Sequence, residues 1–464
     1  MEELKIKKID VKRFNAFVGQ SRSPVAAYVG QELAWYSNTE ETVIGVLILD
    51  IVDNDYVAVI LGRDESGRFR AFDTNSCIQT EDEATHWLIR MMKWHAGKGQ
   101  RIFPQNDAGK GVDLFAPIVP TEKQHPYFIR LIRDPGFSSA KAIINEIMLH
   151  FIDVDGNFVE QFQSTGFDSR LWELYLNLYL SEEQFFVNRE HNAPEFIVEK
   201  SGKKIAIEAV IVGRKDDNPP KYFRYSGQVG TSDNDSEGLD AMAIKFGSPL
   251  YTKLNKRYWE LSHVSGIPLI FAIADFHDDQ SMLWGSTALI NYLYGVKEDF
   301  HYDSNNHLVI IPSKIDVHTA GGKEIPSGYF FQPDAEYVSA VLFSASGTIS
   351  KFNRMGRQAG FGDPNVAMIR EGMCYDHDPD SSLPKVFRYE VDKNSSETWG
   401  EGLSMFHNPN ALYPVPEELF PSIAHHHLLK DGRIESRSPQ FHPYGSVTYI
   451  IRTKDSWKGE GDDL

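Results

Sequence analysis

Two glutamates, Glu195 and Glu208, lie on either side of a predicted β-hairpin. The turn is predicted at Ser201 and Gly202, because short apolar runs flank this small, turn-forming pair. With a two-residue loop, counting back along the ladder places Glu195 opposite Glu208. Their β-carbons are then expected about 5 Å apart, on one face of the sheet.

Two carboxylates at this separation repel each other by roughly 3 kcal/mol at an effective dielectric constant near 20. Protonation of one acid, a nearby lysine or a bound cation would each relieve the repulsion. Glu208 lies in the apolar run 205–212, where a charge needs a partner. Hard oxygen ligands suit Mg²⁺, so the sequence predicts that Glu195 and Glu208 bind Mg²⁺, with Mn²⁺ as a substitute. The alternative is an ordinary exposed hairpin whose acids pair with neighbouring lysines.

The periodicity of apolar residues predicts the elements that position this pair. Expected in chain order are an amphipathic helix over 167–176, a strand over 184–187, the hairpin, a helix from Ser248 to about Leu261, and a strand over 267–274. The last run is apolar throughout, which is typical of a strand covered on both faces. The order is therefore helix, three strands, helix, strand.

Glu173 on the first helix, Pro194-Glu195-Phe196 on one strand and Glu208-Ala209-Val210 on the next resemble the PD-(D/E)XK nuclease superfamily. The resemblance covers roughly residues 165–280. It implies that Glu195 and Glu208 hold one or two Mg²⁺ ions, with Glu173 assisting. The metal then polarises a phosphodiester and lowers the pKa of the attacking water.

The sequence departs from the superfamily pattern at two positions. Glu195 stands where the pattern has Asp, which keeps the carboxylate but lengthens its reach. Val210 stands where the pattern has its catalytic Lys, and an alkyl group cannot stabilise charge on a phosphate. Members of the superfamily can take this lysine from a neighbouring helix. Lys253 is the preferred substitute here, and Lys256 the second choice.

Length and composition predict a multidomain globular protein. The 464 residues are 41% hydrophobic, and no segment approaches the length of a membrane span. Two cysteines form no disulfide framework and the first residues are charged, so a cytoplasmic location is expected. The net charge of −18 opposes general binding to nucleic acid, although lysines and arginines near the hairpin and the following helix could line a groove.

The expected fold class is α/β, with a central restriction-endonuclease-like mixed sheet flanked by helices. Three regions are expected: 1–115 as a β-meander with one helix, 136–347 as the nuclease-like core, and 348–464 as an extension of unknown role. The polar stretch 213–247 is expected to be a loop. A strand is expected over 337–343 in the core sheet.

Two further groups of residues have side chains of the types that bind metal. Asp275 ends a predicted strand and could approach the acidic pair. Three consecutive histidines, His425 to His427, are interpreted as a structural segment, because consecutive side chains point in different directions in both helix and strand.

The function favoured by the sequence is Mg²⁺-dependent hydrolysis of phosphodiester bonds, in DNA. The resemblance suggests a role in restriction or defence. Two alternatives remain open: a noncatalytic nucleic-acid-binding or assembly module on a decayed nuclease core, and a small-molecule hydrolase or ligand sensor. A protein partner or a homo-oligomer is compatible with the sequence.

Overall fold

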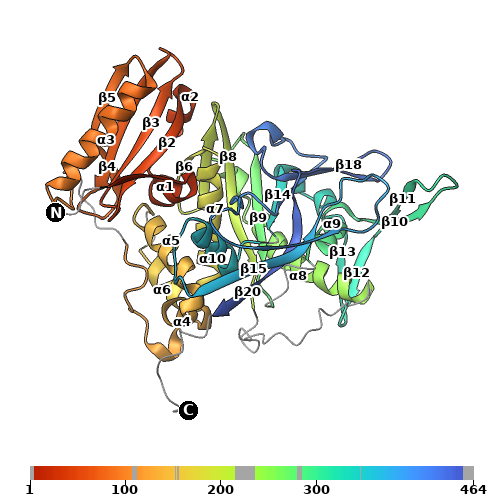
Figure 1. The fold of residues 1–464 in the computed structure, drawn as a ribbon. Helices are drawn as coiled ribbons and strands as arrows, with labels where there is room; N and C mark the ends of the chain where they lie inside the picture. The colour runs from red at the N-terminus through yellow and green to blue at the C-terminus, as the bar shows by residue number, and fades with distance from the viewer. Residues whose placement is uncertain are drawn as a thin grey trace.

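An eight-stranded mixed sheet forms the centre of the protein (Figure 1). The computed structural model describes residues 5–106, 112–151, 153, 156–214, 236–278, 285–344 and 346–452. The strand order is β19-β18-β17-β14-β9-β8-β7-β6. The strands are β6 (Phe186–Asn188), β7 (Phe196–Lys200), β8 (Lys203–Val212), β9 (Leu269–Asp275), β14 (Ala340–Ser344), β17 (Leu403–His407), β18 (Ala424–Leu428) and β19 (Ile434–Arg437).

The middle of the sheet is parallel and fully covered. Strands β8, β9 and β14 run parallel to one another, and every residue of β9 is buried. This explains the continuous apolar run that encodes β9, because both of its faces are packed. The strand expected over 337–343 is β14 and belongs to this sheet.

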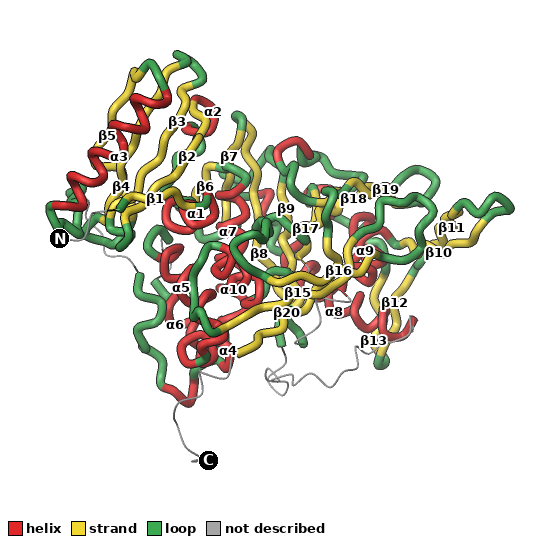
Figure 2. Tube along the Cα trace, viewed as in Figure 1, coloured by secondary structure: helices red, strands yellow, loops and turns green. Residues whose placement is uncertain are grey.

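Helices cover both faces of the sheet (Figures 1 and 2). On one face, α5 (Ser138–Met148), α7 (Phe167–Glu182) and α10 (Ile349–Gln358) share a hydrophobic core with the strands. On the other face, α8 (Ser236–Leu254) and α9 (Gly285–Tyr294) do the same. The fold is therefore a mixed α/β layered structure.

The helix expected from Ser248 begins earlier in the structure. Helix α8 starts at Ser236, and Pro249 lies inside it. Its buried side chains follow helical spacing on both sides of the proline: Ala243, Phe246, Leu250 and Leu254. Burial of this stripe outweighs the loss of one backbone hydrogen bond at the proline. Of the loop expected over 213–247, residues 215–235 lie outside the described residues.

The hairpin has the predicted register. Strands β7 and β8 pair Lys200 with Lys203, Val198 with Ile205 and Phe196 with Ile207. The two loop residues have positive φ angles, 53° at Ser201 and 73° at Gly202, as a type I′ turn requires.

A second, antiparallel sheet lies in the N-terminal region, drawn in red and orange (Figure 1). Its strands are β1 (Ile6–Ile9), β2 (Gly30–Asn38), β3 (Val43–Asp50), β4 (Asp55–Arg63) and β5 (Phe69–Ile78), and α3 (Glu81–Gly97) packs on it. The last three strands and the helix match the expected meander. Strand β2 was not predicted, because a bulge between Glu32 and Ala34 interrupts its alternation.

Residues 348–464 are not a separate extension. They contribute β17, β18 and β19 to the central sheet, so this sheet continues across the boundary expected at residue 347. They also form a small three-stranded sheet from β15 (Val366–Cys374), β16 (Lys385–Glu390) and β20 (Pro443–Arg452). The boundary was misplaced because strand pairing between distant segments leaves no local signal in the sequence.

The remaining elements are short. They are α1 (Val11–Val18), α2 (Ala26–Val29), α4 (Pro126–Arg133), α6 (Phe158–Gln163), β10 (Val296–Tyr302), β11 (Leu308–Lys314), β12 (Val317–Ala320) and β13 (Lys323–Pro326). Strands β10 and β11 form a hairpin that projects from the body (Figure 1). Within the described part of the chain, no helix combines the length and the apolar character needed to cross a membrane.

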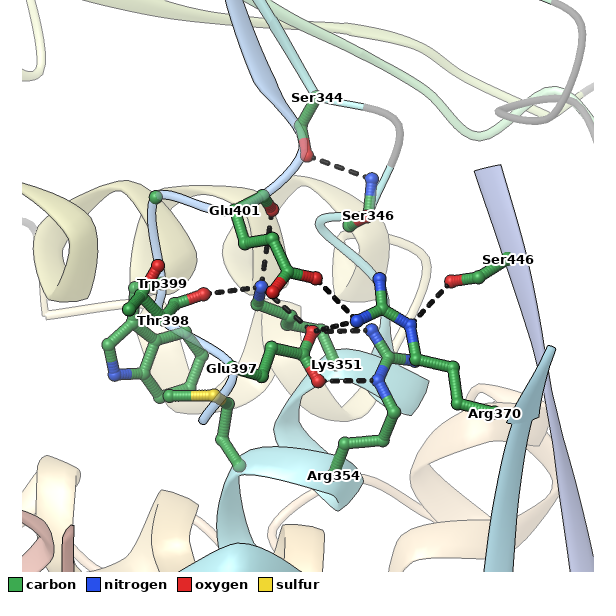
Figure 3. A network of polar contacts seen from close by, with 12 residues as sticks. Ser344, Ser346, Lys351, Arg354, Arg370, Glu397, Thr398, Trp399, Glu401 and Ser446 are labelled. Carbon is green, nitrogen blue, oxygen red and sulfur yellow. Dashed lines mark hydrogen bonds and ion pairs between the residues drawn. The ribbon is translucent and has the colours of Figure 1, made fainter. Parts of the chain in front are cut away.

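A buried network of charged residues joins α10 to the loop before β17 (Figure 3). Glu397 lies at its centre, with Lys351 Nζ 2.9 Å from Oε1 and Arg354 Nε 2.8 Å from Oε2. Arg370 on β15 lies 3.4 Å from Glu397 Oε1 and donates a hydrogen bond to Glu401. The network therefore connects three segments that are distant in the sequence: α10, β15 and the loop before β17.

Candidate metal centre

The structure places Glu195 and Glu208 side by side. The β7–β8 ladder ends at Phe196 and Ile207, so Glu195 lies just beyond the last pair, where the Ala209 N–H has no strand partner. Glu195 Oε2 accepts a hydrogen bond from this Ala209 N–H at 2.8 Å. The carboxylate of Glu195 therefore caps the open edge of β8, next to Glu208.

Helix α8 and the residues after it supply two polar partners to Glu208. Lys253 Nζ and the Tyr258 hydroxyl both donate to Glu208 Oε1, the latter at 2.5 Å. Glu208 and Val210 share one face of β8, and the core on that face includes Val210 and residues of α8. Lys253 thus approaches from the helix that covers Val210, the position where the superfamily pattern has its lysine.

The carboxyl group of Glu195 holds a proton at neutral pH when no metal is bound. Burial, followed by the hydrogen bond and the charge of Glu208, raises the pKa of Glu195 to about 9. Lys253 and the Ala209 N–H act in the opposite direction but do not cancel this effect. At neutral pH the group of Glu195, Glu208 and Lys253 is therefore close to electrically neutral, which makes its burial tolerable.

One oxygen of the pair depends on the proton of Glu195. Glu208 is 1% exposed, and no N–H or hydroxyl group of the described residues donates a hydrogen bond to its Oε2. Without the proton of Glu195, this buried acceptor would have lost its hydration without compensation. A cation held between Glu195 and Glu208 would take the place of the proton. All the ligand atoms here are carboxylate oxygens, so the residues fit Mg²⁺ or Mn²⁺.

Binding of Mg²⁺ at this pair is expected to strengthen as the pH rises. Because the pKa of Glu195 is about 9 without metal, Mg²⁺ must displace a proton at lower pH. The apparent affinity should increase about 50-fold between pH 7 and pH 9 and level off above pH 9. Calorimetric titration in buffers of different ionisation enthalpy should detect close to one proton released per Mg²⁺ at pH 7. Binding that is independent of pH and releases no proton would contradict this charge assignment.

Glu173 is held by arginines on the opposite face of the sheet. Its helix, α7, packs on the face away from α8. Arg170 Nη1 donates to both carboxylate oxygens of Glu173, at 2.9 and 2.8 Å, and Arg189 lies 3.6 Å away. The charge of Arg189 acts on both Glu173 and Glu195. The structure therefore connects Glu173 to the acidic pair through Arg189.

The other acid expected near the site lies farther along the sheet. Asp275 pairs with Val212, four residues beyond Glu208 on β8, so the two acids are separated by about 13 Å along the strands. Its Oδ1 accepts a hydrogen bond from the backbone N–H of His277 at 3.1 Å. Asp275 is therefore not brought to the acidic pair. Lys256, the second choice for the missing lysine, is exposed after the end of α8.

Lys200, Lys203 and Lys204, around the turn of the hairpin, are paired with acceptor groups. Lys203 pairs with Glu418 at 2.8 Å, and Lys200 donates to the carbonyl of Leu419 at 2.9 Å. Lys204 lies 4.0 Å from Glu199. Lys215 lies outside the described residues. These pairings reduce the positive potential around the hairpin, so the hairpin lysines add little attraction for a polyanion.

The three histidines have a neighbour on another strand that the sequence did not reveal. His425 and His427 lie on β18 and share one face, since alternate residues of a strand point the same way. His407 on the neighbouring strand β17 stacks on both rings, with centroid distances of 5.2 Å to His425 and 4.2 Å to His427. The sequence argument considered only consecutive residues. It missed the i, i+2 pair and the partner from another strand.

Comparison of the chain with protein-family models, with curated proteins and with solved structures found no match in any of the three.

Proposed function

We propose that this protein is a Mg²⁺-dependent nuclease that hydrolyses phosphodiester bonds in DNA. The observation that supports this most strongly is the contact of three groups, Glu195, Glu208 and Lys253, delivered by a hairpin and the next helix. The proposed catalytic core is restriction-endonuclease-like and consists of α7, β6 to β8, α8 and β9. The setting suggested by the resemblance is restriction or defence against foreign DNA.

Each residue of the site has a proposed role. Glu195 and Glu208 hold the metal, which would polarise the scissile phosphodiester and lower the pKa of the attacking water. Tyr258 fixes Glu208 through Oε1, which leaves Oε2 available as a ligand. Lys253, whose side chain is 28% exposed, neutralises negative charge that develops on the phosphate. Glu173 acts at a distance, by orienting Arg189.

The acidic surface restricts how the substrate is captured. With a net charge of −18 and the hairpin lysines paired to acids, long-range attraction of DNA is weak. Binding then depends on the metal and on contacts made within the site. We therefore expect little binding of DNA in the absence of a divalent cation.

A panel of substrates tests the proposal. Linear and circular double-stranded DNA, single-stranded DNA and RNA are each incubated with the full chain and Mg²⁺, Mn²⁺ or EDTA. Cleavage of DNA with either metal, abolished by EDTA and by Glu208→Gln, is expected. Glu199→Gln removes an exposed acid from the same hairpin and should cleave like the wild type. Absence of metal-dependent cleavage on every polynucleotide would contradict the proposal.

Replacing Lys253 with methionine is expected to lower kcat by about 100- to 1,000-fold, the usual effect of removing a group that stabilises transition-state charge. The substitution also removes a positive charge next to the acidic pair, so the affinity for Mg²⁺ should change as well as the rate. Steady-state cleavage rates at saturating Mg²⁺ separate these two effects. Lys256→Met is the matched control and should retain full activity. Equal activity of the two variants would exclude Lys253 as the missing lysine.

A noncatalytic nucleic-acid-binding or assembly module is the second candidate. It is favoured because the polar groups of the site are paired without metal: protonated Glu195 forms a hydrogen bond with Glu208, and Lys253 and Tyr258 both donate to Glu208 Oε1. Mg²⁺ titration distinguishes the candidates. A decayed site should show no saturable Mg²⁺ binding that Glu208→Gln removes, whereas a nuclease should show it.

A further inference from the structure

Three potential metal ligands from separate segments meet at the other end of the central sheet. They are His407 at the end of β17, His427 on β18, and Glu417 in the connection between these two parallel strands. Each offers one ring nitrogen or carboxylate oxygen, and the three atoms lie within 4.8 Å of one another. Strands β9, β14 and β17 lie between β18 and β8, the strand of Glu208. The cluster is thus distinct from the acidic pair.

We propose that His407, Glu417 and His427 bind a divalent transition-metal ion, with Zn²⁺ as the preferred ion. Two imidazoles and one carboxylate match the ligand preferences of Zn²⁺ and leave a fourth position for water or another ligand. Mg²⁺ strongly prefers oxygen ligands and is not expected to compete. This inference does not rest on the proposed nuclease activity.

The contact between His427 and Glu417 supports the proposal. His427 Nε2 lies 2.8 Å from Glu417 Oε1, yet this nitrogen makes no hydrogen bond among the described residues. The carboxylate oxygen is therefore close to the nitrogen but not aligned with it for hydrogen bonding. Two ligand atoms held near each other in this way can both be directed at one ion.

His425 forms a hydrogen bond with one ring nitrogen of His407 and so orients the His407 ring. His425 Nε2 lies 3.0 Å from the carbonyl oxygen of Phe420, which can only accept, so His425 carries its hydrogen on Nε2. His425 Nδ1 is then the acceptor for His407 Nε2, 2.9 Å away. This leaves Nδ1 of His407 as the nitrogen with an available lone pair. A histidine held by a second group through its other nitrogen is the usual arrangement around a protein-bound metal.

Two features of the metal-free cluster are unfavourable for a bound ion: the orientation of the two rings and the nearby charge of Arg437. The rings of His407 and His427 are stacked with an interplanar angle of 11°, so their lone pairs run nearly parallel and must converge. His427 has a side chain that is 29% exposed, which leaves room for its ring to rotate. Arg437 lies 3.5 Å from Glu417 Oε2 and opposes a second cation, but it also pairs with Glu435 at 2.7 Å.

Calorimetric titration of the chelator-treated full chain with Zn²⁺, in excess Mg²⁺, tests the proposal. Wild type should bind one Zn²⁺ at this site. His427→Ala and Glu417→Gln should each weaken that binding by more than about 100-fold. His425→Phe should weaken it by about 10- to 100-fold, as expected for loss of an outer partner of a ligand. Glu417 is partly exposed in a connecting segment, so its substitution keeps the test valid even if the histidine variant folds poorly.

His307→Ala is the matched control for adventitious binding by surface histidines. His307 is 65% exposed and pairs with Asp380. Its loss should leave Zn²⁺ binding unchanged, and so should Glu208→Gln in the acidic pair. With Co²⁺ in place of Zn²⁺, visible absorption should appear in wild type and disappear in Glu417→Gln. No Zn²⁺ binding, or binding reduced equally by His307→Ala and Glu417→Gln, would overturn the proposal.

Discussion

Replacing Glu195 with glutamine is expected to reduce nuclease activity by about 100-fold or more and, at the same time, to stabilise the metal-free protein. Activity falls because the amide is a poor ligand for a metal whose Lewis-acid contribution is several kcal/mol. Stability rises because the amide can donate to Glu208 Oε2 without first taking up a proton. Loss of activity with gain of stability distinguishes a functional site from a structural one.

The gain in stability should depend on pH in a defined direction. The pKa of Glu195 is about 9 in the folded protein, against 4.5 for the ordinary side chain, so the folded state binds the extra proton over this range. Stability of the wild type therefore falls as the pH rises from 4.5 towards 9. Glu195→Gln should be more stable than wild type by about 1 to 3 kcal/mol at pH 7, with the difference vanishing near pH 4.

Urea unfolding in EDTA at pH 5 and pH 7 measures this effect. Glu199→Gln, on the same hairpin, should change the free energy of unfolding by less than about 0.5 kcal/mol at either pH. A Glu195→Gln variant that is less stable than wild type at pH 7 would show that the two carboxylates do not repel each other. The basis for a metal between them would then be lost.

Glu397→Ala is expected to lower the free energy of unfolding by about 3–5 kcal/mol, because it leaves buried cations without their common partner. Lys351 and Arg370 are fully buried and Arg354 is 2% exposed. All three surround Glu397 (Figure 3). Burial alone would raise the pKa of Glu397, but the three cations outweigh it and hold the pKa well below its usual range. The contribution of Glu397 is thus present above the ordinary pKa of 4.5 and is lost as the pH falls.

Urea unfolding at pH 7 checks the size of the loss. Glu371→Ala is the matched control, since Glu371 pairs with Arg388 at 3.1 Å on the surface of the same small sheet. This exposed ion pair should contribute less than about 1 kcal/mol. A similar, small loss in both variants would mean that the network of Glu397 does not hold α10 and β15 in place.

The parts of the structure that follow from local sequence were predictable. A two-residue turn fixes the pairing of every residue of a hairpin, so the register of β7 with β8 followed from Ser201 and Gly202 alone. The location of Lys253 on the helix that follows the hairpin likewise indicated that it lies near the acidic pair. In the structure it contacts Glu208. The pairing of Arg170 with Glu173 was also accessible, because side chains three residues apart on a helix are neighbours.

Features that depend on distant segments could not be read from the sequence. His407 and His427 are 20 positions apart and meet only because β17 and β18 are parallel neighbours. The same applies to Lys351 and Glu397, which come from a helix and a loop. In each case the contact depends on which strands or helices become neighbours. The sequence specifies that choice through the whole core and not through any local pattern.

We propose above that Glu195 and Glu208 bind one divalent cation between them. The most direct measurement is anomalous diffraction from crystals of the full chain soaked in Mn²⁺. We expect an anomalous peak between the two carboxylates, within about 2.3 Å of an oxygen from each, and no such peak in Glu208→Gln crystals. Soaked wild-type crystals with no anomalous density between the two acids would contradict this proposal.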